Sequence, residues 1–253
     1  YEIMPSLVGS EMCIRDSFEI LEDLYAAEVS MVDALVGEFL GALRQQGLLD
    51  DTLVIVTSDH GENLGEHGMI DHLLSLYDTT IRVPLIARHP STFAAGTRRG
   101  ELVSLVDVVP TVLDIVGLGD RYPEIAARSL ARPERPAHEF VIAENDRPMN
   151  GIELMKKNFP GFDTSSIDHR MKMLRTESHK LIWWDDGRTE VYDLEADPGE
   201  LEDLSASRPE LTRRLLGLLE EWNEAQQAEA PPPPLDVSDP ELREQLRALG
   251  YVE

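Results

Sequence analysis

The chain has 253 residues, which suffices for one large domain or for a domain with a small appendage. Its content of 42% hydrophobic and 28% charged residues is typical of a folded protein. The formal net charge of −25 argues against nucleic acid and anionic membrane surfaces as partners, because both require a basic patch. No apolar run is long enough to span a bilayer, so the sequence predicts no transmembrane segment.

The first part of the chain does not read as native protein. Residues 6–17, with the sequence SLVGSEMCIRDS, resemble the conceptual translation of a sequencing adapter. We therefore treat residues 1–17 as a non-native segment and leave them out of the fold prediction. The only cysteine, Cys13, lies in this segment, so we assign it no disulfide and no catalytic role. We expect the native sequence to begin near Phe18 and its N-terminal part to be missing.

A helix and a buried strand come next. Apolar residues recur at three- and four-residue steps over residues 18–46, which predicts an amphipathic helix with one buried stripe. Gly47 follows at a position where helix C-caps favour glycine. The β-branched run at 52–57 suits a strand that is buried on both faces, and hence a parallel sheet covered by helices. Together they predict one α/β unit.

Two further strands and a helix follow a polar loop. The apolar runs at 81–87 and 102–106 predict short strands, the first of them irregular or at a sheet edge because it contains Pro84. Asp107 is placed to cap a helix that runs to about Val116. We therefore expect residues 18–136 to be the C-terminal part of a three-layer α/β/α core with a mixed sheet.

The second half of the chain has a different character. Short apolar runs around the turn at 185–187 predict a small antiparallel sheet, and the pattern at 209–227 predicts a helix against it. The predicted strands are 140–143, 173–174, 180–184 and 190–194. We expect residues 137–230 to form this subdomain, with Trp183 and Trp184 in its core and rim. Residues 231–253 are expected to be a proline-rich spacer and a terminal helix.

The residues that suggest chemistry are concentrated in the segment 57–72, directly after the predicted buried strand. It contains three histidines and four carboxylates, at the strand end where open α/β sheets bind their ligands. Asp59 and His60 are adjacent in a loop, and this donor pair can ligate Ca²⁺, Mg²⁺, Mn²⁺ or Zn²⁺. The alternative is simple turn chemistry, since Asp and Gly both favour turns. Two donors do not complete a metal site, so we expect the others to lie outside this chain.

Four segments carry a family resemblance. They are residues 49–68 (LDDTLVIVTSDHGENLGEHG), 106–114 (VDVVPTVLD), 191–200 (VYDLEADPGE) and 246–252 (LRALGYV). In this order they resemble the second metal-binding segment and the C-terminal part of the sulfatases, in the alkaline phosphatase superfamily. The short Asp-His-Gly sequence is shared across that superfamily, whereas the ordered series is specific. The resemblance covers nearly all of the chain from residue 18 onward.

The resemblance implies roles for four residues. Asp59 and His60 match the family's pair of metal ligands, most simply for Ca²⁺. His72 falls where relatives carry a lysine or histidine that contacts the sulfate, and His67 is a second catalytic candidate that could contact the ester or orient a ligand. The family's nucleophile is a formylglycine made in a Cys/Ser-x-Pro-x-Arg segment, which this sequence lacks. We therefore expect the chain by itself to be inactive.

The predicted function is hydrolysis of a small-molecule or glycan sulfate ester by the parent protein. Two alternatives stay open: a phosphodiesterase or phosphonate monoesterase of the same superfamily, and a non-catalytic binding protein that keeps the fold. Resemblance suggests a periplasmic or secreted location. Of the histidines elsewhere, we expect His138 to be solvated, and His169 is a minor candidate for the mouth of the site's pocket.

Overall fold

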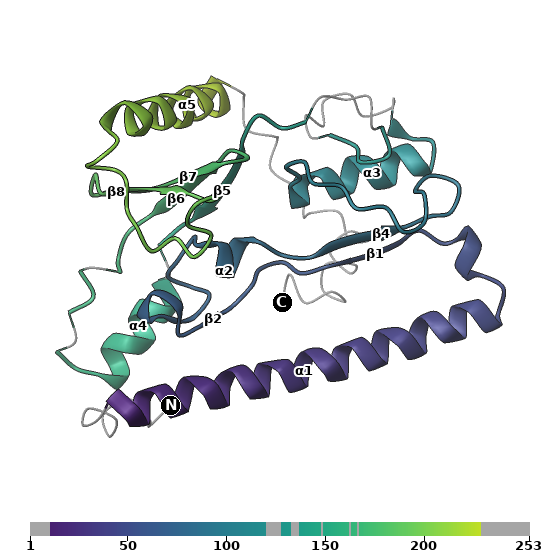
Figure 1. Ribbon diagram of the computed structural model, residues 1–253, viewed down its shortest axis with the longest axis horizontal. Coiled ribbons are helices and arrows are strands. Elements are labelled where there is room, and N and C mark those ends of the chain that lie inside the picture. Colours follow the sequence, from purple (N-terminus) through teal and green to yellow (C-terminus); the bar gives the residue numbers. More distant parts are fainter. Residues whose placement is uncertain are drawn as a thin grey trace, which may run out of the picture. The chain divides into compact units, whose positions relative to one another are not determined.

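The computed structural model describes residues 11–119, 128–132, 137–147, 149–161, 163–165 and 167–228 (Figure 1). The predicted spacer and terminal helix at 231–253, and residues 1–10 of the predicted non-native segment, lie outside these residues. The chain divides into two compact units, Tyr1–Thr212 and Arg213–Glu253. No helix in the described ranges is both long and apolar enough to cross a membrane.

The first element is one long helix, α1 (Glu11–Gln45), which begins earlier than the predicted helix and ends where predicted. Gly47 has a φ of +70°, and the N–H of Leu48 donates to the carbonyl of Leu43 at 3.0 Å. This geometry closes the helix with a left-handed residue, a conformation that glycine adopts without the steric cost of a Cβ. The sequence therefore predicted the C-terminus of α1 correctly.

The predicted burial of α1 is wrong. Leu35, Phe39 and Met31, all in the apolar stripe, are 57%, 64% and 59% exposed. The main contacts of α1 with the described chain are to the 3₁₀ turn η1 (Leu49–Asp51) and to the short strand β2 (Asn63–Leu64), at its two ends. Apolar periodicity identifies a face that favours burial, but it does not show that the same chain contains the covering partner.

The strand predicted at 52–57 is present, but the prediction that it pairs with a parallel neighbour is wrong. Strand β1 (Val54–Thr57) pairs antiparallel with β4 (Leu85–Arg88), and the two run alongside each other in Figure 1. Both strands are only partly buried. The predicted strand at 81–87 is replaced at its start by the short helix α2 (Asp78–Ile81), and pairing begins after Pro84, which has no N–H to donate.

The next element is the helix α3 (Val108–Ile115), close to its predicted bounds. The predicted strand at 102–106 is wrong, because its end forms the 3₁₀ turn η3 (Leu105–Asp107) instead. A reciprocal capping box explains this: the Asp107 carboxylate accepts the N–H of Ser104 at 2.9 Å while the Ser104 side chain caps the turn. An apolar triplet can be a strand or a buried turn, and this local hydrogen bond selects the turn.

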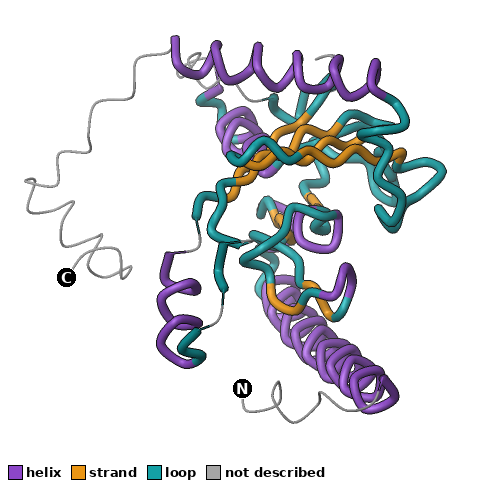
Figure 2. The backbone as a smooth tube through the Cα atoms, turned by 90° about the vertical axis from the view of Figure 1, so that its left-hand side faces the viewer, coloured by secondary structure: helices purple, strands orange, loops and turns teal. Residues whose placement is uncertain are grey.

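The predicted antiparallel sheet is confirmed. Its strands are β5 (Val141–Asn145), β6 (Met171–Arg175), β7 (His179–Trp184) and β8 (Thr189–Asp193), in the order β5-β6-β7-β8, and they lie side by side in Figure 2. The helix α4 (Met149–Asn158), between β5 and β6, was not predicted. The helix α5 (Pro209–Ala228) matches its prediction, with Leu215 and Leu219 buried.

A hydrophobic cluster joins this sheet to the chain before α2. Leu76 and Tyr77 pack with Met171, Ile182 and Trp184, all of them less than a tenth exposed. The sheet therefore anchors the end of the loop that carries the candidate site. In sum, the described chain is a mixed α/β structure built on antiparallel sheets.

Candidate active site

Asp59 leaves the end of β1 with its carboxylate in solvent, the side chain being 87% exposed. One carboxylate oxygen, Oδ1, accepts the backbone N–H of His60 at 3.0 Å. This backbone hydrogen bond is the main reason why the pKa of Asp59 lies below its usual value, and the neighbouring His60 ring adds to the effect. Asp59 therefore presents an ionised oxygen donor over a wide pH range, which suits a hard divalent cation.

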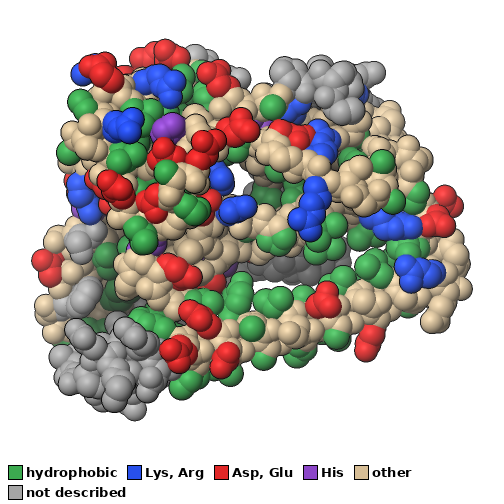
Figure 3. All heavy atoms as spheres, viewed as in Figure 1, with side chains coloured by type: hydrophobic (Ala, Val, Ile, Leu, Met, Phe, Trp, Pro, Cys, Tyr) green, Lys and Arg blue, Asp and Glu red, His purple; other side chains and the backbone are tan. Residues whose placement is uncertain are grey.

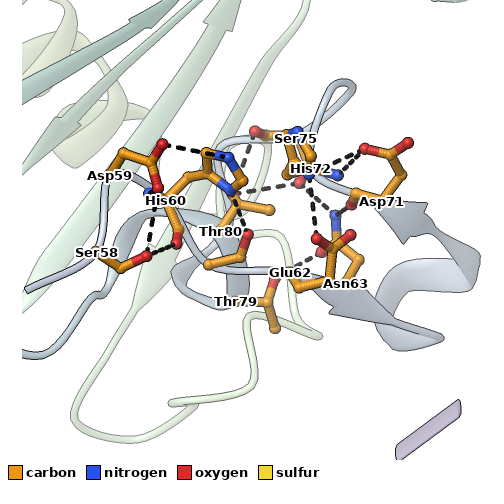
Figure 4. Close-up of polar contacts among 11 residues, drawn as sticks. Ser58, Asp59, His60, Glu62, Asn63, Asp71, His72, Ser75, Thr79 and Thr80 are labelled. Atoms are coloured by element: carbon orange, nitrogen blue, oxygen red, sulfur yellow. Dashed lines mark hydrogen bonds and ion pairs between the residues drawn. The ribbon is translucent and has the colours of Figure 1, made fainter. Parts of the chain in front are cut away.

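His60 and His72 lie face to face beside this carboxylate (Figure 4). Their ring centroids are 3.8 Å apart and the ring planes differ by 21°. The Nδ1 atom of His72 lies 3.1 Å from a carboxylate oxygen of Glu62 and 3.1 Å from one of Asp71. The structure thus brings together three residues predicted for the site, and it adds two carboxylates that the sequence reasoning left unassigned.

The backbone holds Asp59 and His60 next to α2. The N–H of Gly61 donates to the carbonyl of Thr80 at 2.7 Å, and the N–H of Glu62 donates to that of Thr79 at 3.1 Å. A Cβ on Gly61 would lie 2.0 Å from the Thr79 carbonyl oxygen, far inside van der Waals contact. Glycine at this position is therefore required for the close approach of the two backbone segments.

Asn63 is the central anchor of the loop and was missed in the sequence. It is 1% exposed, and its side-chain nitrogen donates to the backbone carbonyl of Asp71 at 2.5 Å and to the Ser75 hydroxyl at 3.0 Å. Its side-chain oxygen accepts the Thr79 hydroxyl at 2.7 Å. Because β2 pairs with β3 (Ile70–Asp71), Glu62 and His72 meet at the open end of one small hairpin. A lone asparagine in a polar segment offers no sequence signal for this burial.

His67 lies apart from the donor atoms of His60 and His72. Its ring stacks on Tyr77 with centroids 3.6 Å apart and planes 9° from parallel. Its φ of +55° is in the left-handed region, where a residue with a Cβ is uncommon. The Tyr77 hydroxyl in turn donates to Glu190 of strand β8 at 2.9 Å. The contacts of His67 therefore favour a role in holding the loop against the small sheet.

A buried ion network ties the same loop to the sheet. Lys180 on β7 is fully buried, and its Nζ lies 2.7 Å from Asp78 and 2.6 Å from Glu200. The same Nζ donates to the carbonyl of Leu76 at 3.2 Å, and Glu200 accepts the N–H of Asp78 at 2.6 Å. These contacts join segments that are more than a hundred residues apart in the sequence, so they position the loop relative to the sheet.

Two histidines outside the loop can be compared with their predictions. His169 lines a cavity of about 110 Å³ together with Tyr77, Trp184 and Glu190, and Asp59, His60 and His72 are not among the residues that line it. The prediction of a solvated His138 is wrong, because its Nε2 lies 2.9 Å from both carboxylate oxygens of the fully buried Asp107. Trp184 belongs to the core of the small sheet as predicted.

Comparison with known proteins supplies the family. The sulfatase model matches residues 21–118. Arylsulfatase K of Bos taurus is 33% identical over 199 residues, a match that covers 76% of this chain and 34% of that protein. The chain therefore spans about a third of the length of the curated relatives that it matches.

Solved structures agree in fold. A protein in complex with its substrate D-glucosamine-2-N,6-O-disulfate aligns with a TM-score of 0.66 at 28% identity, over 80% of this chain and 40% of that chain. The phosphonate monoester hydrolase of Agrobacterium radiobacter aligns with a TM-score of 0.61 at 28% identity, over 79% of this chain and 40% of that chain. The Asp-His-Gly loop lies inside the matched range 21–118. The chain belongs to the sulfatase family, within the alkaline phosphatase superfamily.

Proposed function

We propose that a protein containing this chain hydrolyses sulfuric esters, with Asp59 and His60 as two ligands of its metal ion. The observation that carries the proposal is the ionised, exposed Asp59 next to His60 at the end of β1, inside the range that matches the sulfatase model. A divalent cation held there, Ca²⁺ in the first instance, would neutralise negative charge on the oxygens of the sulfate. Its other ligands and a formylglycine nucleophile would come from sequence outside this chain.

Each histidine of the loop receives a role from its contacts. The Nδ1 edge of His72 faces Glu62 and Asp71, so its Nε2 edge is the one for a substrate oxygen, where it would stabilise charge on the transferred group. For His67, the stack on Tyr77 supports a positioning role in which it keeps the loop in place.

The proposed substrate is a sulfated sugar or a small aryl sulfate. Arylsulfatase K is a sulfuric ester hydrolase by name, and the aligned solved structure holds a sulfated glucosamine as its substrate. We also propose that residues 18–136 complete a three-layer α/β/α core with the rest of such a protein, and that residues 137–230 form its small C-terminal subdomain. The exposed apolar face of α1 supports this proposal, because a core helix needs a partner layer.

A phosphonate or phosphodiester hydrolase is the second candidate. The chain aligns with the phosphonate monoester hydrolase of Agrobacterium radiobacter at 28% identity, the same identity as in the alignment with the sugar-sulfate complex. This equal identity is the reason for the second candidate. Both chemistries use a metal ion next to a tetrahedral anionic group. The Asp59–His60 pair is therefore compatible with either one.

The test uses the full-length protein that contains this chain. We expect it to hydrolyse 4-nitrophenyl sulfate faster than the matching aryl phosphodiester. Asp59→Ala should lower kcat/KM for the sulfate by about 100-fold or more, since it removes a metal ligand, and should abolish thermal stabilisation by Ca²⁺. His89→Ala is the matched control, because the His89 ring hydrogen-bonds to the hydroxyls of Ser91 and Thr92 in its own loop. Preferential hydrolysis of the phosphodiester would select the second candidate instead.

A further inference from the structure

We infer that His60, Glu62 and His72 form a binding site for a borderline transition-metal ion such as Zn²⁺. One donor atom from each of these residues lies within 4.8 Å of the other two. The Glu62 oxygen and His72 Nδ1 are already 3.1 Å apart, and the two imidazole rings are stacked. Two of these residues, Glu62 and His72, are not part of the metal pair in the proposed function.

The donor set decides the kind of ion. Two imidazole nitrogens and one glutamate oxygen are a donor set of zinc sites, and they leave one position open for water or another ligand. A hard cation such as Ca²⁺ instead takes six to eight oxygen ligands. The three residues therefore favour Zn²⁺ over Ca²⁺, because Zn²⁺ binds imidazole nitrogen well whereas Ca²⁺ prefers oxygen ligands.

The distances are close to those of a zinc site. With bonds of about 2.0–2.1 Å, the donors of a tetrahedral zinc ion lie about 3.3–3.4 Å from one another. The pair formed by Glu62 and His72 already meets this spacing at 3.1 Å. All three donor atoms lie within 4.8 Å of one another, and the His60 side chain, which is 43% exposed, has room to rotate toward the other two.

The scaffold beneath the three ligands is rigid. Glu62 and His72 flank the paired residues Asn63 and Asp71, whose strands are locked by the buried Asn63 side chain. Backbone hydrogen bonds from Gly61 and Glu62 to α2 fix the segment that carries His60. A metal site held in this way loses little conformational entropy when the ion binds.

The surroundings also favour a cation. Asp71 lies 3.1 Å from His72 Nδ1, and the Asp59 carboxylate lies 3.8 Å from His60 Nε2 (Figure 4). Carboxylates beside ligating imidazoles orient the rings and make the ring nitrogens more basic.

This site shares His60 with the proposed hydrolase site but does not depend on any hydrolytic activity. A Zn²⁺ ion on these donors would occupy both imidazoles that the proposed function assigns to the hard cation and to the sulfate. Zinc is therefore expected to compete with that cation in the complete protein. The two proposals can fail separately, since one is tested by ester hydrolysis and the other by metal binding to this chain.

The experiment is a titration of the 253-residue chain with Zn²⁺, followed by calorimetry, in the presence and absence of excess Ca²⁺. We expect one zinc ion per chain, not displaced by Ca²⁺. Glu62→Gln and His72→Gln should each weaken binding at least about 10-fold. Glu66→Gln, the same change four residues along the loop, should leave the affinity unchanged, and Asp59→Asn should weaken it less than Glu62→Gln does. Co²⁺ bound in place of Zn²⁺ should give the visible absorption of a four- or five-coordinate ion.

Three results would overturn the inference. One is zinc binding no tighter than calcium binding. Another is an affinity that Glu62→Gln changes no more than Glu66→Gln. The third is a loss with Asp59→Asn as large as with Glu62→Gln, which would assign the ion to the Asp59–His60 pair. Far-UV circular dichroism without metal checks the fold of each variant, and Glu62→Asp, which keeps the charge, replaces any variant that does not fold.

Discussion

Tyr77 and Tyr192 donate their hydroxyls to one carboxylate, that of Glu190, at 2.9 and 2.8 Å. Both rings are buried. Burial is the main reason why the pKa of each hydroxyl lies above its usual value, and the negative charge of Glu190 raises both further. At neutral pH both tyrosines are therefore neutral donors, and Tyr77 is fixed as the platform for His67.

These two tyrosines make the free energy of unfolding fall at alkaline pH. Above the ordinary tyrosine pKa of about 10, the unfolded chain loses protons that the folded chain retains, so the free energy of unfolding falls as pH rises. The double variant Tyr77→Phe/Tyr192→Phe should show a weaker fall between pH 9 and 11, measured by urea unfolding. Tyr25→Phe, at a tyrosine that is 42% exposed, is the control. An unchanged pH dependence in the double variant would contradict the prediction.

Asp107 is the second residue whose partners explain a local structure. It is fully buried and accepts the N–H groups of Ser104 and Arg128, and it contacts His138 with both oxygens. Asp107→Asn keeps the size but removes the charge and one acceptor. We expect it to lower the free energy of unfolding by about 2 kcal/mol or more, because buried partners lose a charged acceptor. Chemical unfolding measures this, and Asp163→Asn, at an exposed residue, should change little.

At the scale of elements, the joint between the loop and the small sheet rests on one buried lysine. Lys180→Met keeps the length of the side chain but removes the cation that Asp78 and Glu200 share, and Asp78 then keeps its contact with Arg175. We expect a loss of about 3–5 kcal/mol, the usual cost of breaking a buried ion pair from one side. The matched control is Lys172→Met on β6, where the lysine pairs with the half-exposed Glu144 and the loss should be below about 1 kcal/mol.

The difference between the two lysine variants measures what burial adds to the ion pair. Equal losses in the two lysine variants would show that the contacts of Lys180 with Asp78 and Glu200 add no more than a surface pair. Adding Glu200→Gln to Lys180→Met should recover part of the loss, because the second change removes an uncompensated buried charge. The pair of variants thus separates the effect of charge from that of packing.

At the scale of the whole molecule, the apolar face of α1 is the most consequential exposed surface. Figure 3 shows its apolar side chains in a row along the helix, and the exposed members include Leu24, Met31, Leu35 and Phe39. Contiguous apolar surface of this kind marks an interaction site or a tendency to aggregate. In the proposed function, the covering layer belongs to the rest of the sulfatase domain.

We therefore expect the isolated chain to bind the dye ANS and to self-associate as its concentration rises. Leu35→Lys with Phe39→Lys should reduce both the dye fluorescence and the association, which light scattering measures. Ser30→Lys with Gln45→Lys adds the same charge off the apolar stripe and should have a smaller effect. Equal effects of the two double variants would show that charge alone, and not the apolar face, controls association.

Much of the structure could be read from local sequence. The hairpin and strands of the small sheet, the end of α1 at Gly47 and the position of α3 depend on residues close together in the chain, and all are confirmed. The segment 57–72 was also identified from its own residues, because histidines and carboxylates gathered after a strand are rare without a role. Propensity, turn chemistry and capping act over a few residues, so one sequence suffices to predict them.

Tertiary structure decided the rest. The antiparallel partner of β1, the exposure of α1 and the pairing of Lys180 with Asp78 all depend on contacts between residues distant in sequence. A β-branched run favours a strand with any partner, and an apolar stripe favours burial under any layer. The free energy of such contacts depends on which surfaces meet in space. The local sequence pattern does not contain that information.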